Sequence, residues 1–186
     1  RGGWRIHTRG CLMRSMSTIM REYDTDKDTH HRYADPYTRL FPDRNGVEMV
    51  LEVGIAGGRG MLAWREIFPR ALIVGYDKEY CHCDRGPRLE FHQGDMRDRA
   101  ALLRAVGGRK FDFICEDAAH QLDANLLCLF WLWPFVKPGG IYVIEEMQDV
   151  NDYEENCKLF AGSEFVNTDA PYGGNEPLVA IRKGKS

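Results

Sequence analysis

The sequence lacks a long apolar run, a large excess of charge of either sign and closely paired cysteines. The longest apolar stretch, Leu126–Val136, is about half the length of a membrane-spanning helix. The net charge is −3, so no strong overall field would attract nucleic acid or anionic lipid. We therefore expect no nucleic acid and no membrane among the partners of this chain.

Cysteines are few for a disulfide-stapled protein: the chain has six in 186 residues. Cys115 and Cys128 lie within strongly apolar stretches, as reduced core cysteines do. The triplet Cys81-His82-Cys83 has no second ligand pair at zinc-site spacing, so no zinc site is predicted there. A reducing cytoplasm is the simplest compartment for such a chain.

Acidic residues are absent from the first 21 positions, which carry five arginines. A transit peptide is one interpretation of this bias. The simpler interpretation is that residues 1–18 are a leader that is disordered or not native. Residues 19–186 then form a single domain, and 44% hydrophobic and 28% charged residues are ordinary values for a globular domain.

From Glu22 onward, apolar strand patterns alternate with helical ones. Buried strands are predicted at Glu48–Val53, Ala71–Tyr76, Leu89–His92, Phe111–Cys115 and Ile141–Ile144. Helices are predicted at Asp35–Phe41, Met61–Phe68, Arg99–Val106, Leu122–Trp133 and Asp152–Phe160, with a turn at Lys137–Gly140.

Two further strands, Glu164–Asn167 and Leu178–Arg182, have no full crossover helix between them, so they are expected to pair antiparallel. The pattern predicts an α/β fold: a Rossmann-like sheet, mostly parallel, with a C-terminal antiparallel strand pair. In such sheets ligands bind at the carboxyl ends of the strands.

The first strand runs into a glycine-rich segment, which lets a ligand approach the backbone closely. NAD would prefer G-x-G-x-x-G directly after the strand, and the nearest match begins four residues too late. The pattern Glu52-x-Gly54-x-x-x-Gly58 is closer to the first motif of class I S-adenosylmethionine (SAM) methyltransferases, although Ala56 replaces the middle glycine and Gly57 adds one beside it. Glu52, Gly54, Gly57 and Gly58 are the first candidate cofactor residues.

Acids also follow the next two strands. Asp77 ends the second strand, where a carboxylate can accept hydrogen bonds from both ribose hydroxyls of NAD or SAM. Asp95 follows the third strand; in SAM enzymes an acid here holds the adenine amine while its neighbour, here Met96, packs on the ring. The alternative for Asp95 is the N-cap of the helix at 99–106.

Four carboxylates are expected to converge near one histidine. The fourth strand ends in Glu116 and Asp117, with His120 three residues on, and the fifth ends in Glu145 and Glu146. Such a cluster is unfavourable unless it is neutralised, and a divalent cation held by oxygen ligands, Mg²⁺, is the simplest solution. A nearby histidine can act as a base.

Several motifs in order resemble those of the metal-dependent macrolide-sugar O-methyltransferases of the demethylmacrocin and mycinamicin type, to which the cephalosporin hydroxylase-like group is related. They are Tyr23-Asp24-Thr25-Asp26-Lys27, His31-Arg32-Tyr33, Leu51-Glu52-Val53-Gly54, Phe113–His120, Lys137-Pro138-Gly139-Gly140 and Tyr142–Glu146.

The resemblance implies a role for each acid that matches. Asp117, Glu145 and Glu146 would bind Mg²⁺, His120 would be the general base, and Glu116 is placed with the cofactor residues, its alternative being a supporting strand-end acid. The sequence departs from the family where Glu116 replaces Asp, Ala118-Ala119 replaces Gly-Ser, and Glu146 replaces Asp. Family members carry a further N-terminal region that helps to build the substrate site, so the resemblance does not imply the acceptor.

The predicted function is SAM-dependent, Mg²⁺-dependent O-methylation of a hydroxyl on a small molecule, a sugar or another natural product. Mg²⁺ would lower the pKa of the acceptor hydroxyl and His120 would remove its proton. A metal-independent SAM methyltransferase and a SAM-binding protein without catalysis remain as alternatives, and an NAD-dependent oxidoreductase is disfavoured by the glycine register. The expected partner is the small-molecule acceptor, and a homo-oligomer is compatible with the sequence.

Overall fold

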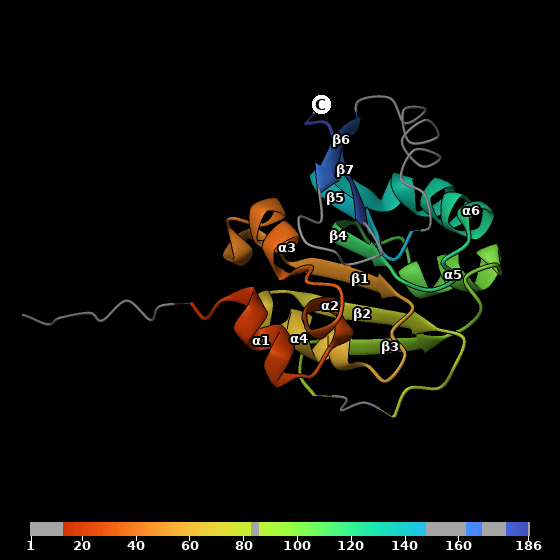
Figure 1. Cartoon of the computed structure of the whole chain (residues 1–186). Coiled ribbons are helices and arrows are strands. Elements are labelled where there is room, and N and C mark those ends of the chain that lie inside the picture. The colour runs from red at the N-terminus through yellow and green to blue at the C-terminus, as the bar shows by residue number, and fades with distance from the viewer. Residues whose placement is uncertain (1–12, 83–85, 148–162, 169–177, 186) are drawn as a thin grey trace, which may run out of the picture.

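The protein is built on a seven-stranded sheet. The structure, a computed structural model, describes residues 13–82, 86–147, 163–168 and 178–185, the segment 163–168 by its backbone alone. Its strands are β1 (Met49–Val53), β2 (Leu72–Asp77), β3 (Leu89–Gln93), β4 (Phe111–Glu116), β5 (Val136–Ile144), β6 (Ser163–Thr168) and β7 (Leu178–Lys183), shown in Figure 1.

The strand order is β3-β2-β1-β4-β5-β7-β6. The first five strands in this order pair parallel, and β7 pairs antiparallel with both β5 and β6. The predicted fold class is confirmed: a Rossmann-like, mostly parallel sheet that ends in an antiparallel pair. The carboxyl ends of β1, β2 and β4 therefore meet at one edge, where the candidate site residues lie.

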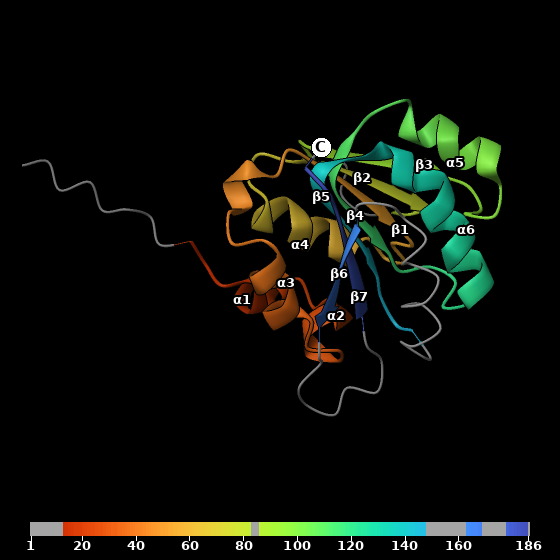
Figure 2. The same cartoon turned by 90° about the horizontal axis from the view of Figure 1, so that it is seen from above.

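Helices cover both faces of the sheet. They are α1 (Met16–Glu22), α2 (Asp26–Thr29), α3 (Ala34–Leu40), α4 (Arg59–Ile67), α5 (Arg99–Val106) and α6 (Leu122–Leu132), with 3₁₀ turns η1 (Arg44–Gly46) and η2 (Trp133–Phe135). In Figure 2 the helices α1 to α4 lie on one face of the sheet, and α5 and α6 lie on the other. None of the helices in the described parts of the chain is long and apolar enough to span a membrane.

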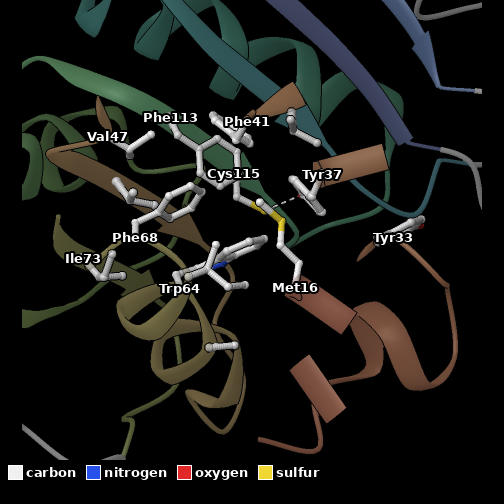
Figure 3. Close-up of a cluster of buried hydrophobic side chains, with 14 of the residues drawn as sticks. Met16, Tyr33, Tyr37, Phe41, Val47, Trp64, Phe68, Ile73, Phe113 and Cys115 are labelled. Atoms are coloured by element: carbon white, nitrogen blue, oxygen red, sulfur yellow. Dashed lines mark hydrogen bonds between the residues drawn. The ribbon is translucent and has the colours of Figure 1, made fainter. Parts of the chain in front are cut away.

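The core has two layers because successive side chains of a strand point to opposite faces. In β4, Phe113 packs toward α3 and α4, whereas Ile114 packs toward α5 and α6. Figure 3 shows the first layer, in which the ring of Phe113 lies 5.7 Å from Tyr37 and 5.3 Å from Trp64. This aromatic cluster fixes α3 and α4 against the sheet directly below the site.

Two N-terminal helices, α1 and α2, have no counterpart among the predicted elements. The side chain of Ser15 caps α1 by accepting a hydrogen bond from the backbone N–H of Thr18 at 3.0 Å, and Met16 and Ile19 are buried. The expected leader at 1–18 is therefore corrected: residues 13–18 belong to the folded domain because they contribute to its core. Residues 1–12 lie outside the described part.

The segment at 137–140, predicted as a turn, lies inside β5. Its pairing with β4 shifts register between Phe111 and Phe113, and Gly139 has φ of 78°. The four residues therefore form a bulge within the strand. The helix predicted at Asp152–Phe160 lies outside the described residues.

Candidate functional site

The ends of β1 and β4 approach each other unusually closely. Gly54 follows β1 with φ of 84°, and a Cβ on this residue would lie 2.1 Å from the carbonyl oxygen of Asp117. Only glycine fits this contact without a shift of backbone. The contact places Asp117 beside the glycine-rich segment that begins at Gly54.

Asp77 holds the glycine-rich loop from the end of β2. Its Oδ2 accepts hydrogen bonds from the backbone N–H groups of Ile55 at 2.7 Å and Ala56 at 3.0 Å. Ala56 has φ of 44°, a left-handed conformation that favours glycine, at the position where the family motif has one. Asp77 thus fixes the conformation of the glycine-rich loop.

A first pocket of about 460 Å³ opens at the ends of β1, β2 and β4. Six of the predicted site residues line it: Gly54, Asp77, Asp95, Met96, Asp117 and His120. The volume falls within the range of small-molecule and cofactor sites. The N-cap of α5 is Asp98, so the alternative role of Asp95 as that cap does not apply.

A second pocket of about 530 Å³ lies on the other side of the same wall. Its lining comes from α2 and the residues before it, from the glycine-rich loop and from the ends of β1, β4 and β5. It includes the predicted site residues Glu52, Gly54, Gly57, Asp117, His120 and Glu146. The two pockets share Gly54, Ala56, Asp117 and His120, so a group bound in one lies next to a group bound in the other.

Lys27 of α2 lies at the centre of the carboxylates. Its side chain is 3% exposed, and its Nζ lies 2.7 Å from Asp117 Oδ2 and 3.3 Å from Glu52 Oε1. Nζ also donates to Glu145, whose other carboxylate oxygen accepts from the hydroxyl of Tyr37. One ammonium group thus faces three carboxylates.

Burial and charge compete at this cluster. Burial opposes the charge on Lys27, but the attraction of Asp117 and the other carboxylates holds the pKa of Lys27 well above its usual value. Burial also raises the pKa of Glu145, and the charge of Lys27 offsets this only in part. The cluster carries two more negative than positive charges when all three acids are ionised, an excess that one divalent cation would balance.

Glu146 lies between two histidines. Its Oε1 lies 3.0 Å from Nε2 of His31, and its Oε2 lies 3.5 Å from Nε2 of His120. The hydrogen bond from His31, together with the nearby charge of His120, keeps the pKa of Glu146 below its usual range despite partial burial. Both His120, with φ of 49°, and Glu146, with φ of 56°, have left-handed backbones, which cluster at functional sites.

The residues present fit a divalent cation. Ligand atoms of Asp117, His120 and Glu146 all lie within 4.8 Å of one another. Within this group, the buried Nδ1 of His120 has no hydrogen-bond partner among the described residues. Open donor atoms and an excess of negative charge are what a metal site requires before its ion binds.

Three predicted site residues line neither pocket. Glu145 was expected to bind metal; it is 1% exposed and its carboxylate is engaged by Lys27 and Tyr37, so its metal role stays a prediction. Glu116 was placed with the cofactor, yet it lines neither pocket, because alternation along β4 turns it to the face of α6. There burial raises the pKa of Glu116 to about 8.

Gly58 is the third of these residues. It lines neither pocket; it is instead the N-cap of α4, with φ of 78°. Glu52 lines the second pocket but is held within the protein, because Trp64 donates to its Oε1 at 3.1 Å. Both residues support the glycine-rich loop from inside the fold.

The residue that sequence reasoning missed is Lys27, together with its neighbours in the chain. The motif Thr25-Asp26-Lys27, followed by His31, carries part of the family resemblance but was assigned no role. The sequence offered no clear signal, because a lysine between Asp26 and Asp28 has the pattern of an exposed charged segment; the burial of Lys27 and Asp28 comes from the structure. Buried lysines are rare unless paired, which points to acids nearby.

Comparison with known proteins agrees with this geometry. No family model matches the chain. It is 35% identical over 153 residues to mycinamicin VI 2''-O-methyltransferase of Micromonospora griseorubida, covering 74% of this chain and 38% of that protein. It is 32% identical over 126 residues to demethylmacrocin O-methyltransferase of Streptomyces fradiae, covering 63% of this chain and 32% of that protein. The chain is thus similar in sequence to part of each of these two O-methyltransferases.

Solved structures of a methyltransferase have a fold similar to that of this chain. The MycE methyltransferase of the mycinamycin pathway, in complex with Mg, SAH and mycinamycin VI, matches with a TM-score of 0.80 at 24% identity. A second MycE structure, with Mg and SAH, matches with a TM-score of 0.75 at 26% identity, covering 92% of this chain and 55% of that one. The chain has the class I methyltransferase fold, and it spans less than half the length of the curated relatives it matches.

Proposed function

We propose that this chain is the catalytic domain of a SAM-dependent O-methyltransferase that acts on a hydroxyl of a sugar-bearing natural product. The observation that carries the proposal is the wall shared by the two pockets, formed by Gly54, Ala56, Asp117 and His120. A methyl donor in the first pocket and an acceptor in the second would meet at this wall. Homology to O-methyltransferases of macrolide sugars supports the same conclusion.

The first pocket is suited to SAM, which when bound supplies an electrophilic methyl group. Asp77 lines the pocket; its Oδ2 accepts from the loop N–H groups and its Oδ1 from the N–H of Glu79 at 2.8 Å, and the carboxylate would also accept from the ribose hydroxyls. Asp95 and Met96 would hold and cover the adenine. Gly54 leaves the backbone open at the wall shared by the two pockets, and Gly57 does so on the side of the second pocket.

Asp117 and Glu146 are the residues we propose to hold Mg²⁺, which when bound supplies positive charge that lowers the pKa of an acceptor hydroxyl. Glu145 acts on the site through Lys27: it orients Lys27, and Lys27 in turn orients Asp117. The glutamate at 146, in place of the family's aspartate, is held by His31, which compensates for its greater flexibility.

His120 is the proposed general base. It lines both pockets, and its side chain is 38% exposed, so an acceptor hydroxyl can reach it. Its imidazole is oriented by Glu146, which would stabilise the charge that forms when His120 takes the proton. Alignment of acceptor oxygen, methyl group and sulfur across the shared wall would supply the rest of the rate enhancement.

The expected compartment and partner agree with other observations. Cys115 and Cys128 are buried thiols in the core, which supports a reducing cytoplasm. The partner is a small-molecule acceptor, because the second pocket is the size of a small-molecule site.

Isothermal titration with SAM, S-adenosylhomocysteine and NAD, each with and without Mg²⁺, tests the proposal without knowledge of the acceptor. We expect SAM and S-adenosylhomocysteine to bind and NAD not to bind. A labelled-SAM screen of sugars, catechols and macrolide glycosides then tests methyl transfer. Binding of NAD without SAM would overturn the proposal, and SAM binding without transfer to any acceptor would favour the non-catalytic alternative.

A metal-independent methyltransferase is the second candidate, and Lys27 is the observation that favours it. Its ammonium already places a positive charge against Asp117 and Glu145. A metal ion is therefore not needed to neutralise part of the charge of these carboxylates. Turnover that is the same in EDTA and in Mg²⁺ would select this candidate. Loss of turnover in EDTA, restored by Mg²⁺, would select the metal-dependent one.

A further inference from the structure

Asp26, the first residue of α2, and His31, which lies two residues after the end of that helix, are not ligands of the Mg²⁺ in the proposed function. Both nevertheless approach Glu146: ligand atoms of Asp26, His31 and Glu146 lie within 4.8 Å of one another. His31 is 7% exposed, and its ring stacks on Tyr33 with centroids 5.2 Å apart. The imidazole is therefore held in place with Nε2 directed at Glu146 rather than at solvent.

Glu146 belongs to two groups of metal-ligating side chains at once. The first is Asp117, His120 and Glu146, and the second is Asp26, His31 and Glu146. Each carboxylate oxygen serves one group, because Oε1 faces His31 at 3.0 Å and Oε2 faces His120 at 3.5 Å. A carboxylate whose two oxygens face separate groups is arranged to bridge two ions.

The separation of one pair of atoms agrees with ligands of a common ion. Metal–ligand bonds of about 2.0–2.2 Å at right angles place neighbouring ligand atoms about 3 Å apart. The separation of His31 Nε2 and Glu146 Oε1, 3.0 Å, equals this value. Asp26 and Glu146 supply two carboxylates to the group, so one divalent ion would balance their charge.

We propose that Asp26, His31 and Glu146 bind a divalent transition-metal ion, at a site separate from the Mg²⁺ of the proposed function and joined to it by Glu146. One imidazole and two carboxylates suit Mn²⁺, Fe²⁺, Co²⁺ or Zn²⁺ better than Mg²⁺, which takes oxygen ligands. Pairs of catalytic ions about 3.5–4 Å apart are common in enzymes, and a shared carboxylate sets such a spacing. The second ion borders the pocket proposed for the acceptor, since Asp26 and Glu146 both line it.

Mn²⁺ is the probe for counting the sites because it accepts both oxygen-only and mixed nitrogen–oxygen ligand sets. Equilibrium dialysis with detection of free Mn²⁺ by electron paramagnetic resonance gives the ions bound per chain. We expect two ions in the parent protein, one in His31→Gln, one in Asp26→Asn, one in Asp117→Asn and neither in Glu146→Gln at the same concentration. Excess Mg²⁺ should displace one Mn²⁺ from the parent protein and leave the ion at His31.

Matched controls lie in the same segment. His30→Gln changes the adjacent histidine, which is exposed, and Asp35→Asn changes an exposed acid at the start of α3. Both variants should retain two ions. Thermal melts of each variant show whether it is folded, and Asp26→Asn keeps the test valid if His31→Gln does not fold, because Asp26 is exposed.

The number of bound ions in the variants distinguishes failure of this site from failure of the Mg²⁺ site. A single Mn²⁺ per chain that is lost in Asp117→Asn and retained in both His31→Gln and Asp26→Asn would overturn the proposal and leave the Mg²⁺ site intact. His31 would then serve only as a hydrogen-bond partner of Glu146. Absence of any bound Mn²⁺ in the parent protein would overturn both this site and the metal of the proposed function.

Discussion

The ammonium of Lys27 lies 2.7 Å from the carboxylate of Asp117, although 90 positions separate the two residues in the chain. This pair joins the N-terminal helices to the end of β4. It also draws Glu52 and Glu145 into one buried cluster. The arrangement makes the site dependent on a segment that precedes the whole sheet.

Lys27→Met should destabilise the protein by about 3–5 kcal/mol, because it leaves buried carboxylates without a partner. Urea unfolding measures the effect, with Lys78→Met, a change at an exposed lysine, as the control. The double variant Lys27→Met/Glu145→Gln should recover part of the loss, since it removes one of the uncompensated charges. Equal stability of Lys27→Met and the parent protein would show that the cluster is not held by this ammonium.

Gly54→Ala should be far more disruptive than Gly57→Ala. A Cβ at Gly54 would lie 2.1 Å from the carbonyl oxygen of Asp117, whereas a Cβ at Gly57 would meet nothing within 4 Å. We expect a loss of several kcal/mol for the first, because the strand ends must separate, and less than about 1 kcal/mol for the second. Paired thermal melts check the difference, and similar losses for both would contradict the close approach of the β1 and β4 ends.

Asp77→Ala should weaken both the glycine-rich loop and cofactor binding. The variant leaves the N–H groups of Ile55 and Ala56 without their acceptor, at a cost of about 1–3 kcal/mol. Titration with S-adenosylhomocysteine measures affinity, and a thermal melt measures stability. Asp35→Ala, at an exposed acid that lines neither pocket, is the control, and unchanged affinity in Asp77→Ala would remove Asp77 from the proposed cofactor site.

His120→Ala should lower methyl transfer by about 10²–10⁴, the usual share of a general base, with little change in affinity for SAM. The loss should diminish at higher pH, where the acceptor hydroxyl ionises without help. Initial rates across pH, with an acceptor from the screen, measure this. A variant that turns over at the parent rate near neutral pH would rule His120 out as the base.

Stability should fall as pH rises from about 5 to 8 because of Glu116. Burial raises the pKa of this carboxyl to about 8 in the folded protein, whereas the unfolded chain has the ordinary value near 4.3. Between these values the folded state binds more protons, so each pH unit costs about 1.4 kcal/mol, and the loss ends above pH 8.

Glu116→Gln should make this part of the profile less steep, since an amide does not titrate, whereas Glu52 and Glu145, whose pKa values are also raised by burial, remain. Urea unfolding at several pH values in EDTA makes the comparison without bound cations. A parent profile that is level from pH 5 to 8, or one that is equally steep in the variant, would contradict the role of Glu116.

The sheet and its ligand-binding edge were predictable because they depend on local patterns. Alternating apolar runs marked the strands, and glycines or acids directly after β1, β2 and β4 marked the edge where Gly54, Asp77 and Asp117 meet. The short helix α2 has only four residues, too few for a helical period to be recognised. Its lysine reaches acids at positions 52, 117 and 145, and such long-range pairs leave no periodic signal.

The directions of Glu116 and Glu145 could have been inferred more fully from strand alternation. Cys115 and Val143 pack toward α3 and α4. Glu145 lies two residues after Val143, so its side chain points to the same face, where it contacts Tyr37. Glu116, one residue after Cys115, turns to the opposite face. What alternation does not give is the partner, because Lys27 comes from outside the sheet.

The contacts of Lys27 with Asp117 and Glu145 at the strand ends limit which segments of this chain can be exchanged with those of a relative. A chimaera that exchanges the segment 16–40 for that of a relative, to change the wall of the second pocket, also exchanges the cation on which Asp117 and Glu145 depend. Grafts that keep a lysine at position 27 and vary only the exposed positions around it should fold. Grafts that lose the lysine should fail before their selectivity can be assayed, so directed evolution of the acceptor preference would start from the residues around Lys27 rather than from Lys27 itself.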